Sequence, residues 1–342
     1  MRTRLLKGST RSVFDAAALI RAGQVVAFPT ETVYGLGANA LDADAVARIF
    51  SAKERPADNP LIVHIAAVEE AFPLCHWTPD AQTLAQAFWP GPLTMLLKKK
   101  SIIPPITTAG LQTVAVRMPS HPLALALIKA SGCPIAAPSA NRSSRPSPTT
   151  AMHVLEDMSG RIPMILDGGP SSVGVESTVL DMSGDTPTIF RPGAVTCEQI
   201  TMVLGECCVS DSVLRPVPAT QNAPSPGMRH KHYAPKARMT LVKGDANRVA
   251  QYIASRYDRD ENAAILAFEE HVPLYGARHT QSLGKDAMDA AHRLFYLLRG
   301  MDLGGITRIY AETLPENGLG LAVMNRMARA AGFDVVNADN EY

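Results

Sequence analysis

A proline-rich segment between Val209 and Pro226 interrupts an otherwise regular pattern of apolar strands and helices. It holds four prolines with scattered Ser, Thr and Asn, which is the composition of a linker. A chain of 342 residues is also too long for one small domain. We therefore expect a first domain over residues 1–208, a linker over 209–238 and a second domain over 239–342.

The part before the linker predicts a single α/β unit between about Phe14 and Leu204. Apolar runs bounded by Gly and Pro give its elements. The predicted helices are 15–22, 44–50 and 122–131, and the predicted strands are 24–28, 61–65, 113–118, 134–138, 177–181 and 188–191. The Ser- and Pro-rich stretch 139–150 is predicted to be a loop.

After the linker, strands and helices alternate. The predicted strands are 239–243, 263–268 and 306–311, and the predicted helices are 246–257, 286–298 and 320–331. This alternation favours a small, doubly wound, Rossmann-like domain with a parallel sheet.

The charge of the chain is distributed unevenly. The net charge is only +1, so it gives no argument for nucleic-acid or membrane binding. Two stretches, however, contain basic residues and no acidic ones: the stretch between Asp80 and Glu156, and that between Asp211 and Asp245. Two such blocks indicate an anionic substrate held between them, although basic runs also form ordinary solvated faces.

The cysteines and the N-terminus indicate the compartment. The five cysteines show no C-x-x-C motif and no metal-ligand spacing, as expected in a reducing cytosol. The charged N-terminus precedes no long apolar run, so we expect neither a signal peptide nor a membrane span. The prediction is a cytoplasmic protein without membrane contact.

Two polar pairs carry the first chemical signal. Lys53 and Arg55 place two cations two residues apart, and Ser139 and Asn141 place a hydroxyl and an amide at the same spacing. Together they would supply charge and directional hydrogen bonds to a triphosphate. Taken singly, the cations are more often surface charges and the polar pair more often forms a turn.

Other motifs are weaker alone. The Pro29–Gly37 segment is rich in hydroxyls and carries two glycines, which serve turns or close backbone approach to a ligand. It is neither a Walker A loop nor a dinucleotide fingerprint. His64 lies in an apolar strand, where a hydrogen-bonded core histidine is as frequent as a ligand contact. His230 and His232 suggest a metal pair, but no carboxylate or cysteine is near them in the sequence, which argues against zinc.

In combination, the motifs resemble one known family. The chain is similar to the YrdC/Sua5 family through an ordered series of segments: PTETVYGLG, KERPADNPL, WPGPLT, VAVRMPSHP, PIAAPSANRSSRPSPT, STVLDM and FRPGAV. It continues through SPGMRHKHYAP into a second domain with GLGLAVMNRMARAAG, as the longer Sua5-type members do. The resemblance implies a YrdC-like twisted mixed sheet with a positive concave face, followed by a Sua5 C-terminal domain.

The resemblance also implies an activity. Members of the family combine L-threonine, bicarbonate and ATP into threonylcarbamoyl-adenylate and pyrophosphate, which makes them nucleotidyltransferases. A partner, the TsaD-type tRNA threonylcarbamoyltransferase complex, then transfers the threonylcarbamoyl group to N6 of adenosine 37 in tRNA. ATP brings Mg²⁺ as the expected cofactor, and no protein side chain is assigned to the metal.

Site residues follow from the same resemblance. Those implied for ATP are Lys53, Arg55, Asn59, Thr113, Ser139, Asn141, Ser147, Arg191, His230 and Tyr233. Those implied for L-threonine are Thr32, His64, Arg117, Ala137 and Ser177, with Ala137 limited to backbone groups. Lys53 and Arg55 are the expected catalytic residues, because they would screen the charge that develops on the phosphates.

The chemistry of threonine fits this division. Arg117 can bind its carboxylate bidentately, and Thr32 and Ser177 can bind its remaining polar groups. We expect no protein nucleophile, because the threonine carbamate itself attacks the α-phosphorus. The segment from Ser225 to Pro235 is expected to close over the first domain as a lid that excludes water, with either His230 or Tyr233 touching the nucleotide.

Two other functions remain open. One is a binding module for tRNA or double-stranded RNA, in which the two basic blocks contact phosphates. The other is carbamoyl transfer from carbamoyl phosphate, as in hydrogenase-maturation relatives. Pyrophosphate release that depends on both L-threonine and bicarbonate distinguishes the synthase from both alternatives.

Overall fold

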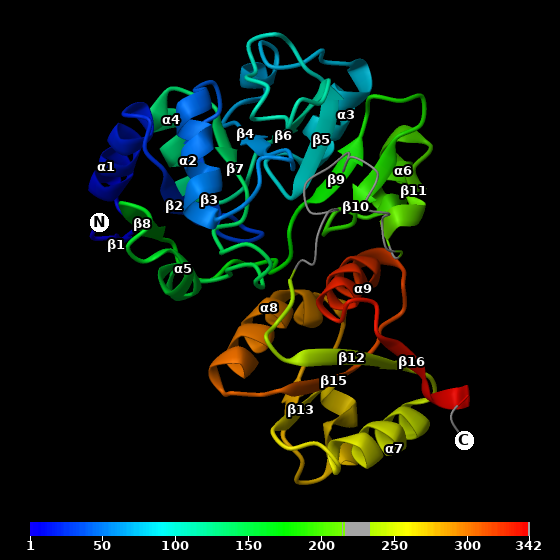
Figure 1. Cartoon of the computed structure of the whole chain (residues 1–342). Coiled ribbons are helices and arrows are strands. Elements are labelled where there is room, and N and C mark those ends of the chain that lie inside the picture. Colours follow the sequence, from blue (N-terminus) through cyan, green and yellow to red (C-terminus); the bar gives the residue numbers. More distant parts are fainter. Residues whose placement is uncertain (214, 216–232, 341–342) are drawn as a thin grey trace. The chain divides into compact units, whose positions relative to one another are not determined.

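The computed structural model describes residues 1–213, 215 and 233–340 (Figure 1). They divide into two compact units. The first unit comprises 1–143 and 147–213, and the second comprises 144–146, 215 and 233–340. Among these residues no helix has both the length and the apolar composition that a membrane crossing requires.

The first unit alternates helices and strands. Its helices are α1 (Thr10–Arg21), α2 (Ala43–Lys53), α3 (Pro79–Phe88), α4 (Pro122–Ser131), α5 (Ala151–Met158) and α6 (Cys197–Leu204), with short 3₁₀ turns at Val68–Ala71 and Asp211–Val213. Its strands are β1 (Arg4–Lys7), β2 (Val26–Phe28), β3 (Gly35–Asn39), β4 (Ile62–His64), β5 (Leu93–Lys98), β6 (Thr113–Arg117), β7 (Ile135–Ala137), β8 (Met164–Asp167), β9 (Thr178–Asp181), β10 (Thr188–Arg191) and β11 (Cys208–Val209).

Local chemistry sets the helix ends. The Asp42 carboxylate accepts hydrogen bonds from the backbone of Asp44 and Ala45 at the start of α2. Helix α4 begins at a proline and ends before Gly132, whose φ of 64° is in the left-handed region that glycine favours. These signals lie in the sequence, which explains why 122–131 was predicted with the observed bounds.

The strands of the first unit form one mixed sheet. In the described residues it has eleven strands, in the order β1-β8-β2-β3-β7-β4-β6-β5-β9-β10-β11. The pair β4–β6 is parallel, whereas β4–β7 and β5–β6 are antiparallel. The sheet therefore places segments that are far apart in the sequence on neighbouring strands.

The two faces of this sheet are covered differently. Helices α2, α3, α5 and α6 contribute to a large core on one face, with strand residues such as Val63 and Val116. On the other face, α1 and α4 pack over the β2, β7 and β8 part. Beyond them, the β4–β6–β5–β9 part of that face carries, among the described residues, a small apolar cluster of Ile62, Leu96, Ala115 and Val179.

The second unit is a smaller α/β layer structure. Its sheet consists of β12 (Arg238–Lys243), β13 (Ala263–Ala267), β14 (Thr280–Ser282), β15 (Arg308–Glu312) and β16 (Val335–Asn337). Its helices are α7 (Ala246–Tyr257), α8 (Ala287–Leu303) and α9 (Gly318–Ala330), with 3₁₀ turns at Glu269–Tyr275 and Ala338–Asn340. All strand pairs are parallel, in the order β14-β13-β15-β12-β16. Figure 1 shows α7 on one side of the sheet and α8 and α9 on the other.

The predicted fold class is confirmed by these two sheets. Three predicted elements have the same bounds in the structure: the strand 188–191 and the helices 122–131 and 246–257. The other predicted elements differ from the observed ones by a few residues at their ends. Several elements were not predicted, among them β1, β3, β5, β8, α3, α5 and α6. Strand β3 was missed because its glycines were assigned to a ligand loop or a turn.

The glycines of β3 have a packing role. A Cβ on Gly37 would come within 2.6 Å of Ile135 Cγ2 and 2.7 Å of Phe28 Cε1. Such distances are far below van der Waals contact. Gly37 therefore lets strand β3 pass close to the side chains of its neighbours, which corrects the prediction of a turn.

Candidate functional site

Three motifs meet around one segment of the first unit. The backbone of Glu31 and Thr32 accepts hydrogen bonds from Val173 (2.8 Å) and Gly174 (3.2 Å). Further along, the Tyr34 carbonyl accepts one from Ala140 at 2.8 Å, and Gly35 forms a bridge with Ser139. The Thr-Glu-Thr segment thus lies between the Ser-Ala-Asn loop and the loop that leads to Ser177.

The register of the sheet brings further predicted residues to one face. His64 is the cross-strand neighbour of Arg117 in β6 and of Ile135 in β7, and Ile62 is the neighbour of Ala137. Because side chains alternate between faces along a strand, residues directly opposite one another share a face. His64, Arg117 and Ala137 therefore lie on the face that bears the small apolar cluster.

The same register adds the outer strands. Arg191 and Thr94 are both neighbours of Val179, and Thr113 is two positions before Ala115. All three consequently share the face of Arg117. Thr113 and Arg117 lie at opposite ends of β6, about 13 Å apart along the strand at its usual rise per residue. They would have to contact different parts of a ligand.

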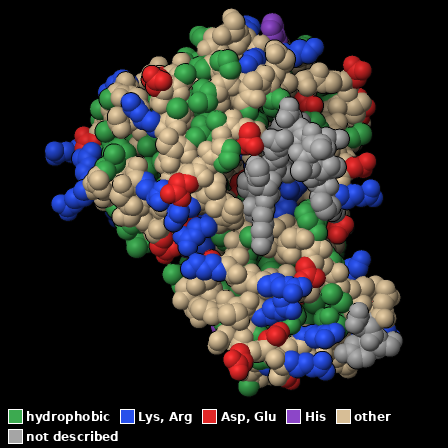
Figure 2. Space-filling model, in the orientation of Figure 1, with side chains coloured by type: hydrophobic (Ala, Val, Ile, Leu, Met, Phe, Trp, Pro, Cys, Tyr) green, Lys and Arg blue, Asp and Glu red, His purple; other side chains and the backbone are tan. Residues whose placement is uncertain are grey.

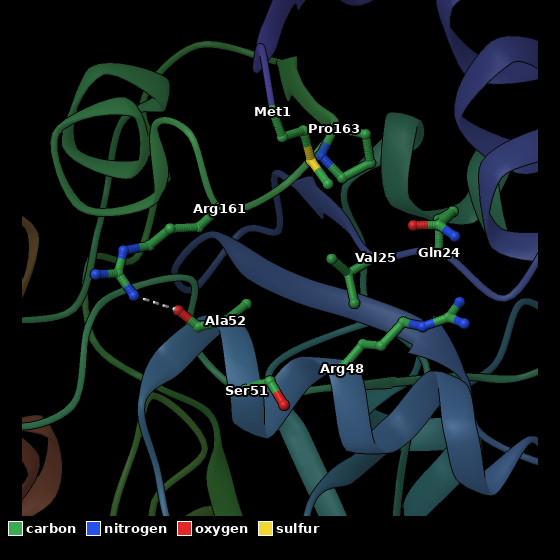
Figure 3. Close-up of a pocket in the computed structure, with 8 residues that line it drawn as sticks. All are labelled: Met1, Gln24, Val25, Arg48, Ser51, Ala52, Arg161 and Pro163. Carbon is green, nitrogen blue, oxygen red and sulfur yellow. Dashed lines mark hydrogen bonds between the residues drawn. The ribbon is translucent and has the colours of Figure 1, made fainter.

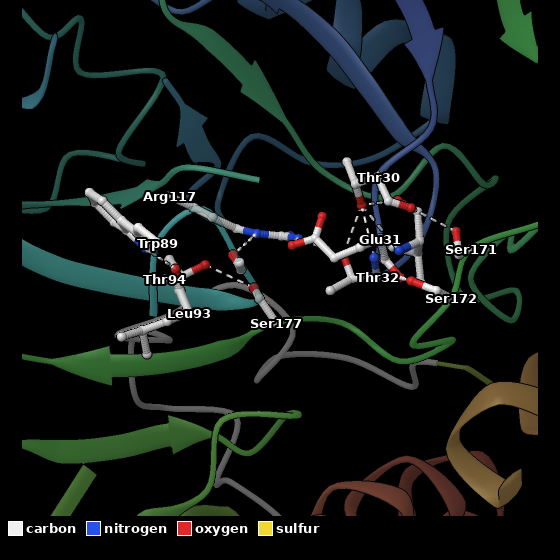
Figure 4. Close-up of polar contacts among 12 residues, drawn as sticks. Thr30, Glu31, Thr32, Trp89, Leu93, Thr94, Arg117, Ser171, Ser172 and Ser177 are labelled. Atoms are coloured by element: carbon white, nitrogen blue, oxygen red, sulfur yellow. Dashed lines mark hydrogen bonds and ion pairs between the residues drawn. The ribbon is translucent and has the colours of Figure 1, made fainter. Parts of the chain in front are cut away.

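Arg117 is held in place on this face. It is 3% exposed, and its Nε donates to the Gly91 carbonyl at 3.2 Å while Nη1 donates to Thr32 Oγ1 at 3.0 Å. Its Nη2 lies 2.6 Å from Glu31 Oε1. Figure 4 shows the Glu31 carboxylate pointing at the Arg117 guanidinium. The contacts with Gly91, Thr32 and Glu31 thereby fix the orientation of the guanidinium.

A second polar group surrounds Ser177. Its hydroxyl lies 2.8 Å from that of Thr94 and accepts from Arg191 Nη2 at 3.1 Å (Figure 4 shows the Thr94–Ser177 contact). Arg191 Nε also donates to the Ser177 carbonyl at 3.1 Å. Gly193 permits this close packing, since a Cβ there would lie 2.3 Å from the Thr178 nitrogen.

His64 is neutral in this setting. Its Nδ1 lies 3.1 Å from the Ile62 carbonyl and 3.3 Å from the Ile135 carbonyl, and carbonyls only accept, so Nδ1 carries the proton. Burial lowers the pKa of His64 to about 3, and the charge of Arg117 acts in the same direction. The Nε2 atom is consequently a hydrogen-bond acceptor beside Arg117.

Lys53, Ser139 and Asn141, three of the residues predicted to bind ATP, form a separate set of contacts. Lys53 is only 2% exposed, so the interpretation of a surface charge is wrong for this residue. Its ammonium donates to the carbonyls of Ser139 and Asn141, the latter at 2.6 Å. The Ser139 hydroxyl donates to Asn141 Oδ1 at 2.5 Å. Lys53 therefore shapes the Ser-Ala-Asn loop.

Arg55 and Asn59 lie after α2. Arg55 is half-buried and its Nη2 donates to the Asn59 carbonyl at 3.4 Å. Asn59 is 1% exposed, and neither polar atom of its side chain has a hydrogen-bond partner among the described residues. A buried amide in this state indicates a ligand-binding position.

The remaining predicted residues are placed as follows. Ser147 donates a short hydrogen bond to the Glu176 carboxylate. Tyr233 belongs to the second unit, where its ring stacks on Phe295 with centroids 5.3 Å apart. His230 and most of the predicted lid lie outside the described residues.

Two buried carboxylates were missed by sequence reasoning. Glu31 and Glu176 are each 6% exposed, and both contact residues from the acid-free stretch between Asp80 and Glu156. Another residue of that stretch, Arg142, pairs with Glu54 at 2.6 Å. Figure 2 accordingly shows acidic side chains among the basic ones on the visible face. The only sequence signal for these two carboxylates was that each is an acidic residue within a hydroxyl-containing motif, Glu31 in PTETVYG and Glu176 in GVEST.

A pocket lies elsewhere on the first unit. It has a volume of about 380 Å³ and is lined by Met1, Gln24, Val25, Arg48, Ser51, Ala52, Arg161 and Pro163. Figure 3 shows the two arginines extending in different directions. Arg48 donates to the Gly23 carbonyl and Arg161 pairs with Glu54 at 2.8 Å. None of the predicted site residues lines this pocket.

Comparisons with known proteins agree with the two-part architecture. Residues 18–193 match the Sua5_yciO_yrdC family model, described as "Telomere recombination". Residues 195–332 match a model described as "Threonylcarbamoyl-AMP synthase, C-terminal domain".

Individual relatives match along nearly the whole chain. A threonylcarbamoyl-AMP synthase of Bacillus subtilis is 48% identical over 332 residues, which cover 95% of this chain and 94% of the relative. One of Pyrococcus abyssi is 47% identical over 326 residues, covering 94% of each. A crystal structure of P. abyssi Sua5 complexed with L-threonine superposes with a TM-score of 0.91 at 44% identity, covering 98% of this chain and 99% of that one.

Proposed function

Since the chain belongs to the Sua5/YciO/YrdC family, we propose that it is a threonylcarbamoyl-AMP synthase that uses L-threonine, bicarbonate and ATP and releases pyrophosphate. The relatives that match almost end to end carry that enzyme name. The similar P. abyssi protein is described as complexed with L-threonine, which supports threonine as the amino acid.

One observation carries the proposal. His64, Arg117, Ala137 and Ser177, all expected to contact threonine, lie together on the face that bears the small apolar cluster, and Thr32 Oγ1 accepts a hydrogen bond from Arg117 Nη1. The Arg117 guanidinium is held by the Gly91 carbonyl, the Thr32 hydroxyl and the Glu31 carboxylate. A guanidinium held in this way is ready to bind a carboxylate. The neutral His64 supplies an acceptor without adding charge.

ATP would lie toward the other set of residues. Asn59, with its unpartnered buried amide, precedes β4, and the Ser-Ala-Asn loop follows β7. Because β7 is antiparallel to β4, the C-terminal end of β7 lies beside the N-terminal end of β4. Strand β6 is parallel to β4 and begins with Thr113 at the same end of the strands. We assign this end of the strands to the nucleotide.

The chain's own residues would act by positioning. Arg117 orients the threonine carboxylate, and Lys53 fixes the loop that carries Ser139 and Asn141. A carbamate oxygen held near the α-phosphorus then displaces pyrophosphate without a protein nucleophile. Lys53 and Arg55 would screen the charge on the phosphates, and a lid over 225–235 would protect the mixed anhydride from water.

Magnesium is proposed to arrive with ATP. In the part of the chain that the structure describes, no group of three or more His, Cys, Asp or Glu could hold a metal ion. Phosphate oxygens and water are ligands that Mg²⁺ accepts readily, and the bound ion would neutralise phosphate charge. The product would pass to a TsaD-type complex for transfer to tRNA, and the enzyme would act in the cytoplasm.

Pyrophosphate release tests the proposal. Full-length protein should release pyrophosphate only when ATP, Mg²⁺, L-threonine and bicarbonate are all present. Omission of threonine or bicarbonate should reduce release to background. Salt-sensitive RNA binding without such turnover would instead establish the binding-module alternative, and turnover of carbamoyl phosphate would establish carbamoyl transfer.

A further inference from the structure

Glu31 is a buried acid that pairs with Arg117. Its side chain is 6% exposed, and its Oε1 lies 2.6 Å from Arg117 Nη2. Neither carboxylate oxygen has a hydrogen-bond partner among the described residues, and the same is true of Arg117 Nη2. The two groups therefore form a close ion pair, while Nη2 and the two carboxylate oxygens make no hydrogen bond of good geometry within the described residues.

Burial of such a pair is costly unless further partners satisfy it. An ion pair removed from water is stabilised only when hydrogen bonds complete its geometry, and a buried polar atom without a partner marks strain or a ligand position. An ionised glutamate can accept hydrogen bonds but cannot donate them, so the two carboxylate oxygens of Glu31 require a donor. The Nη2 group of Arg117 donates and requires an acceptor.

Those two requirements describe one kind of ligand. A zwitterionic α-amino acid carries an ammonium group with three N–H donors and a carboxylate acceptor two bonds away. Its carboxylate would complete the Arg117 guanidinium, and its ammonium would complete the Glu31 carboxylate. Thr32, the residue after Glu31, contacts Arg117 through its hydroxyl, so the three groups converge (Figure 4).

We propose that Glu31 binds the α-ammonium group of the substrate, so that Glu31 and Arg117 together select a zwitterionic amino acid. The proposal rests on the proposed function, because it takes L-threonine as the substrate. It adds a residue that discriminates an amino acid from a hydroxy acid of the same carbon skeleton. Glu31 is thus a specificity-determining residue in addition to a counterion.

The test compares two ligands on matched variants. L-Threonine and 3-hydroxybutanoate share the carboxylate and the hydroxyl, and only threonine has the ammonium group. Their dissociation constants would be measured by competition against labelled L-threonine on the full-length wild type, Glu31→Gln and Glu31→Asp. Glu31→Gln keeps the size of the side chain and removes its charge, whereas Glu31→Asp keeps the charge and shortens its reach.

We expect Glu31→Gln to weaken threonine binding by about tenfold or more, which corresponds to ~1.4 kcal/mol, and to leave 3-hydroxybutanoate nearly unchanged. The preference of the wild type for threonine would shrink accordingly, with Glu31→Asp in between. Glu70→Gln is the matched control, because Glu70 accepts a backbone hydrogen bond from Ala66 and should leave both ligands unaffected.

Two results would overturn the proposal. If both ligands weaken by the same factor, Glu31 acts only by holding Arg117. If neither changes, Glu31 does not meet the substrate. Should Glu31→Gln fail to fold, Glu31→Asp alone decides, since a smaller preference for threonine is expected there and an unchanged preference refutes the idea. A wild type that does not bind L-threonine at all refutes the proposed function instead.

Discussion

The ammonium of Lys53 donates a hydrogen bond to the main-chain carbonyl of Asn141 at 2.6 Å. This contact joins the last residue of α2 to a loop 88 residues further along the chain. The two polar pairs that stand out in the sequence are therefore parts of one structure. Lys53 has a role in shaping the loop in addition to its predicted role at the phosphates.

Lys53→Met tests the loop-shaping role. Methionine keeps the length of the side chain but leaves the carbonyls of Ser139 and Asn141 without this donor. A buried acceptor left unsatisfied costs roughly 1–3 kcal/mol. We expect a lower urea midpoint and strongly reduced pyrophosphate release.

The matched control is Lys129→Met, which changes an exposed lysine in the last turn of α4. It should change neither quantity appreciably. Normal stability and normal turnover of Lys53→Met would contradict both the loop-shaping and the phosphate-screening roles.

Arg117→Lys tests carboxylate recognition. Lysine keeps the positive charge but cannot donate two parallel hydrogen bonds. Hydrogen bonds to charged groups contribute about 1.5–3 kcal/mol, so the KM for L-threonine should rise on the order of 10–100-fold with a smaller effect on the KM for ATP. Steady-state kinetics with each substrate varied in turn provides the measurement.

Arg142→Lys serves as the comparison, because Arg142 pairs with Glu54 at a half-exposed position. Its kinetics should remain close to wild type. An equal rise in both KM values for Arg117→Lys would indicate a general loss of structure rather than loss of threonine recognition.

His64 predicts a dependence of stability on pH. Its pKa is about 3 in the folded protein, well below the ordinary value of 6.5, because it is buried near Arg117. The unfolded state therefore binds a proton that the folded state does not, so stability falls as pH drops below about 6.5. Between pH 7.5 and 5.0 this single group should cost about 2 kcal/mol.

Urea unfolding of wild type and His64→Gln at both pH values isolates this contribution. Glutamine does not titrate, so the variant should lose about 2 kcal/mol less than the wild type over that interval. An identical pH dependence of the two proteins would show that the pKa of His64 does not differ between the folded and unfolded states.

Gly37→Ala tests the close packing of β3. The added Cβ would have to displace Ile135 or Phe28, and overpacking of this kind typically costs about 1–3 kcal/mol. Thermal unfolding should show a lower Tm. Gly184→Ala is the control, because a Cβ there meets nothing within 4 Å, and its Tm should stay near that of the wild type.

Helices and strands with strong local signals, and the chemistry of the motifs, could be predicted from the order of the amino acids. Helix 122–131 has a proline at its start and a glycine after its end, and these act within a few residues. The parallel domain after the linker followed from alternation alone. Strand β3 was missed because its glycines are typical of turns and ligand loops, whereas Gly37 here leaves room for the side chains of Phe28 and Ile135 on the two neighbouring strands.

The contacts between the motifs, and the burial and pairing of the charged side chains, depend on the tertiary structure. Cross-strand register places His64 beside Arg117 and leaves Thr113 at the far end of the same strand. Lys53, which resembles a surface cation in the sequence, is buried and donates hydrogen bonds to backbone carbonyls. Glu31 is buried beside Arg117 and forms an ion pair with it. Pairings of this kind depend on the packing of segments far apart in the sequence, whereas capping and alternation depend on near neighbours.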